Sequence, residues 1–188
     1  MPQSIIDQED FGKAECPSYL KKLDLGCGDR KKEGFLGVDF SPDVKPDFIH
    51  DLNSYPYPFD DNSVYEVFTS HFIEHVADIK KFMEECYRIL VPLGTITIVA
   101  PYYSSIRAFQ DYTHVRPISE NTFLYFSKEW MDANKLNHYG VKCDFEIVRR
   151  KFYYAPEWES RSEPARDWAR EHYINVIQDI EVTLRTKK

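Results

Sequence analysis

Two short stretches of the sequence combine glycine with acidic residues in a spacing that suits a nucleoside-bearing ligand. The stretch Leu23–Gly28 reads Leu-Asp-Leu-Gly-Cys-Gly, and Gly37-Val38-Asp39 follows after a short connection. Gly26 and Gly28 have no side chains, so a ligand can approach the backbone there and the chain can adopt left-handed dihedrals. Asp39, at the predicted end of the next strand, is placed to accept hydrogen bonds from a ribose diol. The pattern therefore predicts a cofactor that contains a nucleoside.

The same residues indicate which cofactor this is. A dinucleotide fingerprint needs a third glycine or alanine where the chain has Lys31, and an acidic residue later than Asp39. The Asp24-x-Gly26-x-Gly28 pattern instead resembles motif I of the class I S-adenosylmethionine-dependent methyltransferases. The resemblance implies S-adenosylmethionine as cofactor. Its methionine part would lie against four residues of the turn and its ribose against Asp39; the four are Asp24, Gly26, Cys27 and Gly28, with Cys27 contributing its backbone amide rather than its sulfur.

A second stretch is similar to the same family. Phe-Thr-Ser-His-Phe-Ile-Glu-His-Val at 68–76 is followed by a segment that ends Tyr-Arg-Ile-Leu-Val-Pro-Leu-Gly-Thr-Ile-Thr-Ile at 87–98, and the resemblance spans residues 19–126. It implies that Ser70 and His71, at the end of a strand, lie beside the cofactor. Asp51 and Leu52, after a third short strand, would meet the adenine. Alternatively, Asp51 caps a turn, as such residues commonly do.

Composition limits the other possibilities. A chain of 188 residues fits one domain, and four scattered cysteines without a C-x-x-C pair indicate reduced thiols rather than a zinc framework. A formal charge of −7 and a pI near 5.4 argue against a nucleic-acid partner, which would require a basic face. We find no apolar stretch long enough to span a membrane and no leader, so we expect a cytoplasmic protein without a membrane partner.

The resemblance implies an α/β fold with a doubly wound, mostly parallel sheet of about seven strands, Rossmann-like as in the methyltransferases, and the apolar patterns along the chain are compatible with it. The connection from Gly28 to Phe35 is too short for the usual crossover helix, so we expect a shortened first crossover. Residues 1–188 would form one domain with an N-terminal arm (1–17), a substrate or lid insertion (101–140) and a C-terminal helix (160–188). The prediction of that last helix is based on an apolar stripe, which is typical of core packing or of a homodimer face. The stripe consists of Ala165, Ala169, Tyr173, Val176, Ile180 and Leu184.

One histidine motif has two interpretations. His71-x-x-Glu74-His75 has the spelling of an inverzincin zinc site, in which two histidines share a helix face. Such a site needs a third ligand and a preceding fold that the sequence does not offer. We therefore expect no metal, and His75 as a packing and hydrogen-bonding residue.

The candidate catalytic residues follow the fifth predicted strand. Asp111 and His114 lie in the loop that faces the methyl group in this class of fold. A histidine titrates near neutral pH and can remove a proton from an attacking hydroxyl or amine, while a carboxylate can orient the imidazole. Equally, Asp111, Thr113 and Arg116 could hold the loop together by hydrogen bonds and a salt bridge.

These observations lead to one principal function and two rivals. We expect methyl transfer from S-adenosylmethionine to an oxygen or nitrogen of a small-molecule acceptor, with His114 as base. A non-catalytic S-adenosylmethionine-binding module or partner subunit would explain the abbreviated crossover. A nicotinamide-dependent reductase is disfavoured by Lys31 and by the early position of Asp39.

Overall fold

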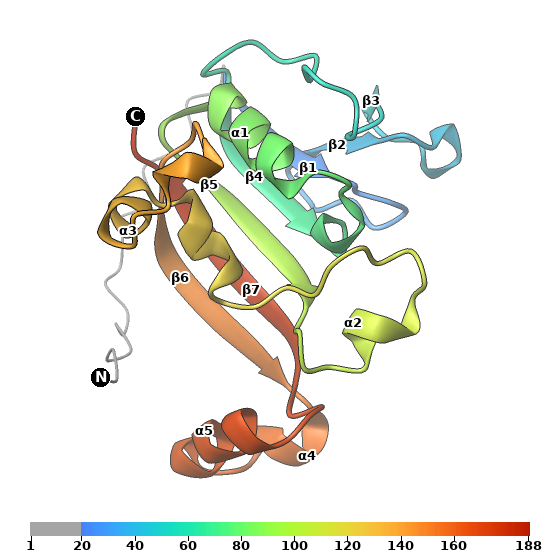
Figure 1. The fold of residues 1–188 in the computed structure, drawn as a ribbon. Coiled ribbons are helices and arrows are strands. Elements are labelled where there is room, and N and C mark those ends of the chain that lie inside the picture. The colour runs from blue at the N-terminus through green and yellow to red at the C-terminus, as the bar shows by residue number, and fades with distance from the viewer. Residues whose placement is uncertain (1–19) are drawn as a thin grey trace.

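The structure, a computed structural model, describes residues 20–188 and is built on one seven-stranded sheet (Figure 1). The strand order is β3-β2-β1-β4-β5-β7-β6, and all neighbours are parallel except β7, which runs antiparallel to both β5 and β6. The order reverses between β1 and β4, which confirms the predicted doubly wound, mostly parallel sheet. The predicted N-terminal arm, 1–17, lies outside the described residues. The strands are β1 (Lys21–Leu25), β2 (Leu36–Asp39), β3 (Phe48–Ile49), β4 (Val64–Ser70), β5 (Leu90–Pro101), β6 (Phe145–Tyr154) and β7 (Ile177–Thr186).

The first half of the described chain contains little helix. The connection from β1 to β2 has none, which confirms the shortened crossover, and only the single 3₁₀ turn η1 (Pro42–Val44) separates β2 from β3. The connection from β3 to β4 is an extended loop. After β4 come the 3₁₀ turn η2 (Ile73–His75) and the eleven-residue helix α1 (Ile79–Ile89).

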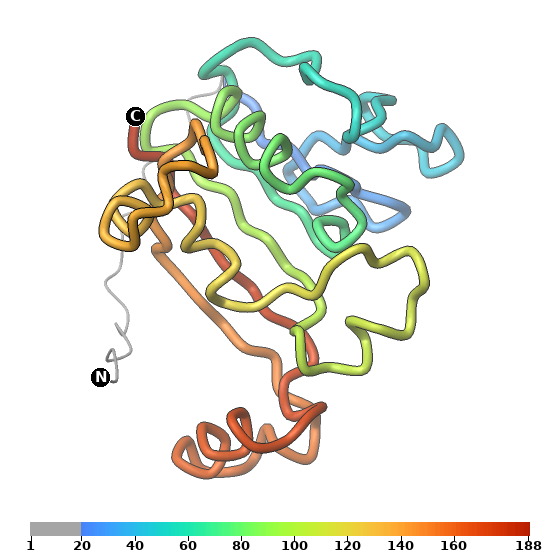
Figure 2. Tube along the Cα trace, viewed as in Figure 1, coloured from blue at the N-terminus to red at the C-terminus, as the bar shows by residue number. Residues whose placement is uncertain are grey.

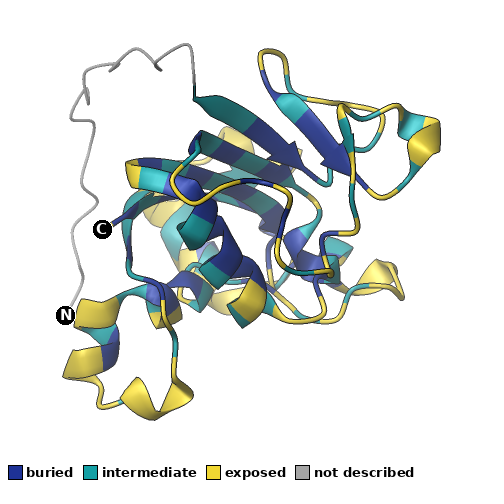
Figure 3. Ribbon diagram, turned by 90° about the horizontal axis from the view of Figure 1, so that it is seen from above, coloured by how far each residue is buried: buried dark blue, intermediate teal, exposed yellow. Residues whose placement is uncertain are grey.

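Helix α1 covers one face of the sheet, as its sequence predicts. Asp78 caps its first turn by accepting a hydrogen bond from the backbone N–H of Lys81, at 3.1 Å. Its apolar side chains recur at helical spacing and are buried against the sheet, as are the inward residues of β4, β5 and β7 (Figure 3). Buried and half-buried residues alternate along these strands. The fully buried layer includes Leu23, Val67, Phe82, Ile96 and Val182.

The opposite face of the central strands is polar and half-buried. Lys22 on β1 forms an ion pair with Glu66 on β4, at 3.0 Å. Further along, the hydroxyls of Thr97 on β5 and Thr183 on β7 are 3.0 Å apart. The sheet therefore has one apolar face under α1 and one polar face, a pattern more usual in antiparallel sheets.

The segment between β5 and β6 turns back over the apolar face (Figures 1 and 2). It contains α2 (Arg107–Gln110), η3 (Thr122–Phe126), α3 (Lys128–Ala133) and η4 (Asn137–Tyr139). Ser127 caps α3 by accepting a hydrogen bond from the N–H of Trp130 at 3.5 Å. The helix ends at Ala133.

The predicted C-terminal helix, 160–188, is wrong in its second half. The chain forms α4 (Pro156–Glu159) and α5 (Glu163–His172), and then the long strand β7. Ile180 and Leu184 fit a helical stripe, but Val182 lies between them and all three are buried on one face of β7, so the true period is two. The β-branched residues of this run favour a strand, and tertiary pairing with β5 and β6 decided the outcome.

No helix in the described part of the chain is long and apolar enough to cross a membrane.

Candidate functional site

The glycine turn after β1 has the geometry that the sequence predicts. Gly26 and Gly28 both have left-handed backbones, with φ of 70° and 52°. A Cβ on Gly26 would lie 2.6 Å from ring atoms of Phe72, so only glycine fits there without displacing that ring. Beside Gly28, by contrast, a Cβ would meet no described atom within 4 Å. The turn is therefore packed at its first glycine and open at its second.

Asp39 joins the end of β2 to this turn. Its carboxylate accepts the backbone N–H of Gly28 on Oδ2 and that of Ser41 on Oδ1, each at 3.0 Å. The side chain is only 8% exposed, yet each oxygen keeps a second lone pair. The sequence therefore correctly predicted that the acidic end of β2 lies beside the glycine turn, although Gly28 and Asp39 are eleven residues apart in the chain.

Asp24 is buried at the end of β1 and stabilises the connection that replaces the crossover helix. It is 2% exposed, and its Oδ2 accepts the backbone N–H of Lys32 at 2.8 Å. Burial raises the pKa of this carboxyl group, while the Lys32 N–H and charge oppose the shift. One oxygen of Asp24 therefore holds the loop in place beside the turn.

Cys27 does not present its amide as freely as expected. Its backbone N–H donates to the carbonyl of Val38 at 3.3 Å, and Gly26 donates to the same oxygen at 2.8 Å. The sulfur lies against Gly37, where an added Cβ would be 2.7 Å from it. Burial raises the pKa of the Cys27 thiol to about 11, so the group is a protonated packing residue and not a nucleophile.

The third strand end has a different arrangement from the predicted one. Asp51 caps a turn, accepting the N–H of Asn53 at 2.9 Å, and Leu52 is 3% exposed within the core. Two large apolar side chains at the ends of β2 and β3 are instead exposed: Phe40 at 73% and Ile49 at 64%. Neither residue is among those expected from the sequence, although Phe40 directly follows Asp39 and its position could have indicated it.

Ser70 and His71 lie at the carboxyl end of β4, as expected. His71 has a left-handed backbone, with φ of 53°, and its N–H donates to the carbonyl of Val99 at 2.9 Å. Its side chain is 46% exposed, and its Nδ1 is 3.5 Å from Oε1 of Glu74. This carboxylate raises the pKa of His71, against the effect of partial burial.

The loop after β5 folds onto the segment that follows β4 (Figure 2). The N–H of Val115 donates to the carbonyl of Glu74 at 2.9 Å. The guanidinium of Arg116 donates to the backbone carbonyls of Val76 and Ala77, at 2.9 Å for the latter. Arg116 thus fixes the loop through hydrogen bonds to backbone carbonyls. The alternative in which Arg116 holds the loop by a salt bridge is therefore wrong about the type of contact.

This docking brings the two candidate catalytic residues together. Nε2 of His114 is 4.0 Å from Oδ2 of Asp111 and 3.9 Å from Oε1 of Glu74. Nδ1 of His114 lies 3.1 Å from the carbonyl of Ala108, which can only accept, so Nδ1 carries the proton and Nε2 has the lone pair. Oδ1 of Asp111 accepts from the hydroxyl and the N–H of Thr113, so this carboxylate also closes the turn of the loop.

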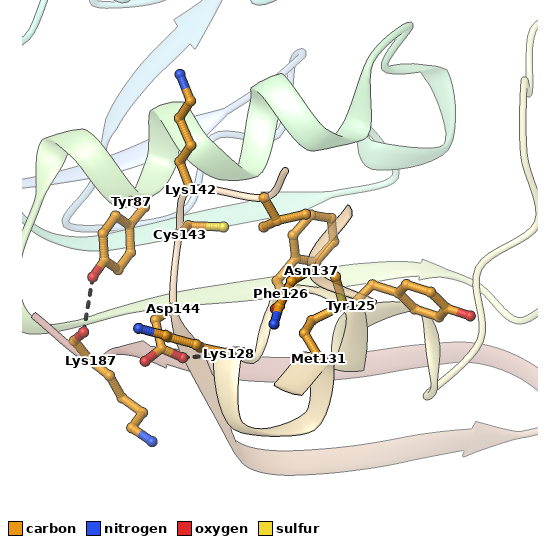
Figure 4. A pocket seen from close by; sticks show the side chains of 11 residues that line it. Tyr87, Tyr125, Phe126, Lys128, Met131, Asn137, Lys142, Cys143, Asp144 and Lys187 are labelled. Atoms are coloured by element: carbon orange, nitrogen blue, oxygen red, sulfur yellow. Dashed lines mark hydrogen bonds between the residues drawn. The ribbon is translucent and has the colours of Figure 1, made fainter. Parts of the chain in front are cut away.

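A hollow of about 440 Å³ lies elsewhere in the molecule (Figure 4). Its lining includes Tyr87, Met131 and Cys143, and none of the predicted site residues. Residues 141–144 precede β6 and Lys187 follows β7, so the hollow is at the opposite end of the sheet from the glycine turn. Ligands of open α/β sheets bind at the carboxyl ends of the parallel strands, and we therefore place the site there and not in this hollow.

Comparison with known proteins agrees with this geometry. Residues 23–98 match the family model described as a methyltransferase domain, and no curated protein matches the chain. The chain resembles the crystal structure of a SAM-dependent methyltransferase from Archaeoglobus fulgidus, with a TM-score of 0.62 and 20% identity over 90% of this chain and 87% of that one. It also resembles an S-adenosylmethionine-dependent methyltransferase from Mesorhizobium loti, with a TM-score of 0.55 and 16% identity over 90% and 93% of the two chains.

A third similar structure is phosphoethanolamine N-methyltransferase 2 of Haemonchus contortus in complex with S-adenosyl-L-methionine, with a TM-score of 0.51 and 15% identity over 93% of this chain and 50% of that one. At these identities the structural likeness establishes the fold. The family match covers β1 to β5, and with them the glycine turn and the acidic strand end. Residues 23–98 therefore match a methyltransferase domain, and the described chain has the fold of the class I S-adenosylmethionine-dependent methyltransferases.

Proposed function

We propose that the protein transfers the methyl group of S-adenosylmethionine to an oxygen or nitrogen of a small-molecule acceptor. The observation that carries the proposal is the pairing of Asp39 with the N–H of Gly28, which puts an acceptor-only group beside an open glycine turn. A ribose diol matches the free lone pairs of Asp39. The methionine part of the cofactor would lie along Asp24 and the turn.

The adenine would lie at the ends of β2 and β3. Phe40 offers an exposed aromatic face next to Asp39, and Ile49 an exposed apolar one. The oxygens of Asp51 can accept from the adenine amino group, although they also cap a turn. Phe40 would thus cover the adenine ring, in place of Leu52, which is expected from the sequence to meet the adenine but is buried in the core.

The acceptor would bind on the side of His71, Asp111 and His114. The lone pair of His114 Nε2 and the carboxylate of Asp111 are the groups available to take the proton that the acceptor loses. Methyl transfer from a sulfonium needs no strong base, since positioning supplies much of the rate. The net charge of −7 favours a small acceptor over a nucleic acid.

The test is a transfer assay with isotopically labelled S-adenosylmethionine and a panel of phenols, amines and sugars, with the products identified by mass. We expect one acceptor class to be methylated on oxygen or nitrogen. With that acceptor, His114→Gln and Asp111→Asn should lower kcat while binding of S-adenosylhomocysteine stays unchanged. Binding of the cofactor without turnover on any acceptor would instead support a binding module or partner subunit.

A further inference from the structure

Glu74 is a buried carboxylate that has no hydrogen-bond partner among the described residues. It is 2% exposed, and neither Oε1 nor Oε2 forms a hydrogen bond. Leaving an ionised carboxylate buried and unpaired is costly, so such a group needs a cation. The nearby guanidinium of Arg116 does not supply it, because it donates to backbone carbonyls. His71 approaches to 3.5 Å, without hydrogen-bond geometry, and its ring is nearly half exposed.

Two histidines complete a set of potential ligands around this carboxylate. One oxygen of Glu74 and one ring nitrogen each of His75 and His114 all lie within 4.8 Å of one another. The two imidazole rings are perpendicular neighbours, with centroids 4.7 Å apart. Glu74 and His75 come from η2, whereas His114 comes from the loop that Arg116 docks onto it.

The hydrogen bonds behind the two rings fix their tautomers. Nδ1 of His114 donates to the carbonyl of Ala108, at 3.1 Å. The hydroxyl of Thr113 donates its one proton to Asp111 at 2.7 Å, so it accepts from Nδ1 of His75 at 3.0 Å. Both rings therefore have their lone pair on Nε2. Ligating histidines are typically held in this way, with the second nitrogen donating to a carbonyl or another acceptor.

We propose that Glu74, His75 and His114 bind a divalent transition-metal ion. One carboxylate and two imidazoles form a ligand set that suits zinc and its neighbours in the first transition row. Ligand atoms around a tetrahedral zinc ion are about 3.4 Å apart, given bonds of about 2.0 to 2.1 Å. The 3.9 Å between Glu74 Oε1 and His114 Nε2 needs only a small contraction to reach this spacing. His75 is partly exposed and leaves the ion a route of entry.

The proposed set differs from the one that the sequence motif suggests. The His71-x-x-Glu74-His75 spelling pairs the two histidines of the motif, whereas in the fold His114 takes the place of His71. We expected no metal because the sequence offers no third ligand near the motif. The third ligand, His114, comes instead from 39 residues beyond His75, in a loop whose docking the sequence does not reveal.

The consequence for methyl transfer rests on the proposed function, although ion binding itself does not. An ion on Nε2 of His114 occupies the lone pair of that base, and Asp111 remains, 4.0 Å from the same nitrogen, to take the proton. A hydroxyl that binds the ion loses its proton more readily. The site would thus favour acceptors that carry an oxygen ligand.

The experiment measures metal binding directly. After treatment with a chelator, the full chain is titrated with Zn²⁺ and, separately, with Mg²⁺, and bound metal is counted after dialysis. We expect one Zn²⁺ per chain and much weaker binding of Mg²⁺, which prefers oxygen ligands. Glu74→Gln and His114→Ala should each weaken Zn²⁺ binding by at least about tenfold. His138→Ala, on the exposed turn η4, is the matched control and should bind as the wild type does.

Further measurements distinguish a metal ion held by Glu74, His75 and His114 from one held by cysteine thiolates. At alkaline pH, where His71 is neutral, Glu74→Gln should leave the unfolding temperature of the metal-free protein unchanged or higher, because it removes a buried charge that has no hydrogen-bond partner among the described residues. The same substitution should abolish the rise in unfolding temperature that Zn²⁺ causes in the wild type. Co²⁺ should give a spectrum without a thiolate charge-transfer band. Absence of stoichiometric Zn²⁺ binding, equal affinity in Glu74→Gln, or a thiolate band would each overturn the proposal. Titration with S-adenosylhomocysteine tests the cofactor site independently, so the two can fail separately.

Discussion

Replacement of Asp39 by asparagine tests the centre of the proposed cofactor site. In the structure the Asp39 carboxylate accepts the N–H groups of Gly28 and Ser41, each at 3.0 Å. Asparagine keeps one oxygen as acceptor and replaces the other by an NH₂ donor, which faces a donor in the turn or on the ribose. The substitution therefore affects both the local fold and the bound ligand, and the two effects can be measured apart.

The expected magnitudes follow from the lost hydrogen bonds. A hydrogen bond to a charged group contributes about 1.5 to 3 kcal/mol, so loss of one ribose contact should weaken binding of S-adenosylhomocysteine by about 10- to 150-fold. The unpaired N–H in the turn should lower the free energy of unfolding by about 1 to 3 kcal/mol, or the unfolding temperature by roughly 2 to 10 °C.

Isothermal calorimetry at a temperature where both proteins are folded gives the binding effect, and thermal unfolding gives the stability effect. Asp43→Asn is the matched control, because it makes the same chemical change at an exposed residue of η1. We expect the control to bind and unfold as the wild type does. If Asp39→Asn bound S-adenosylhomocysteine as tightly as the wild type, Asp39 would not hold the ribose and the proposed cofactor orientation would be wrong.

Three further predictions concern the elements that hold the site. Gly26→Ala should lower the free energy of unfolding by more than about 2 kcal/mol, because φ is 70° and the new methyl group would lie 2.6 Å from the ring of Phe72. Gly28→Ala has open space around it and should lower the free energy of unfolding by only about 1 kcal/mol. Urea unfolding measures both. Arg116→Met should lower the free energy of unfolding by about 2 to 3 kcal/mol and make the loop at 107–116 more sensitive to proteolysis, since backbone carbonyls lose a charged donor. His71→Gln should destabilise the protein more at acidic than at alkaline pH. The carboxylate of Glu74 raises the pKa of His71 in the folded protein, so the contact stabilises the fold fully below the unfolded pKa of 6.5. This stabilisation is lost as the pH rises through the pKa of His71 in the folded protein. The effect on unfolding temperature should be small, because the His71 side chain is 46% exposed and its charge is screened by solvent.

Each of these has an outcome that would contradict it. Equal losses for the two glycine variants would mean that the Phe72 ring moves freely. Unchanged proteolysis of Arg116→Met would show that the loop docks without the guanidinium. For His71→Gln, the exposed control is His138→Gln. If the difference in unfolding temperature between wild type and His71→Gln did not change with pH, the contact between His71 and Glu74 would not stabilise the fold.

The sequence predicted the first half of the fold because the decisive signals there are local. The glycine turn, the acid at the end of the next strand and the connection too short for a helix all appear within residues 23–39, and each was confirmed. Helix α1, after β4, likewise has local signals in its sequence, because its cap at Asp78 and its apolar spacing agree with its observed bounds.

The second half depended on contacts between distant residues. Ile180 and Leu184 are compatible with both a helix and a strand, and only the pairing of this segment with β5 on one side and β6 on the other selects the strand. The grouping of Glu74, His75 and His114 likewise depends on Arg116 reaching carbonyls about forty residues earlier in the chain. No local pattern encodes such a contact. Asp111 and His114 could be singled out by residue type, but their surroundings could not.

The missing helix after β1 affects which form of the cofactor the turn would hold more tightly. A helix that began at Gly28 would direct a positive dipole at the ligand, as in sites for diphosphates. Here the connection is irregular, Lys31 pairs with Asp47 at 2.8 Å, and the carboxylates of Asp24 and Asp39 influence the Cys27 thiol in the turn more strongly than Lys31 does. Such a field attracts a cation more than a neutral molecule. We therefore expect the charged substrate to displace its uncharged thioether product readily, which would limit inhibition by accumulated product.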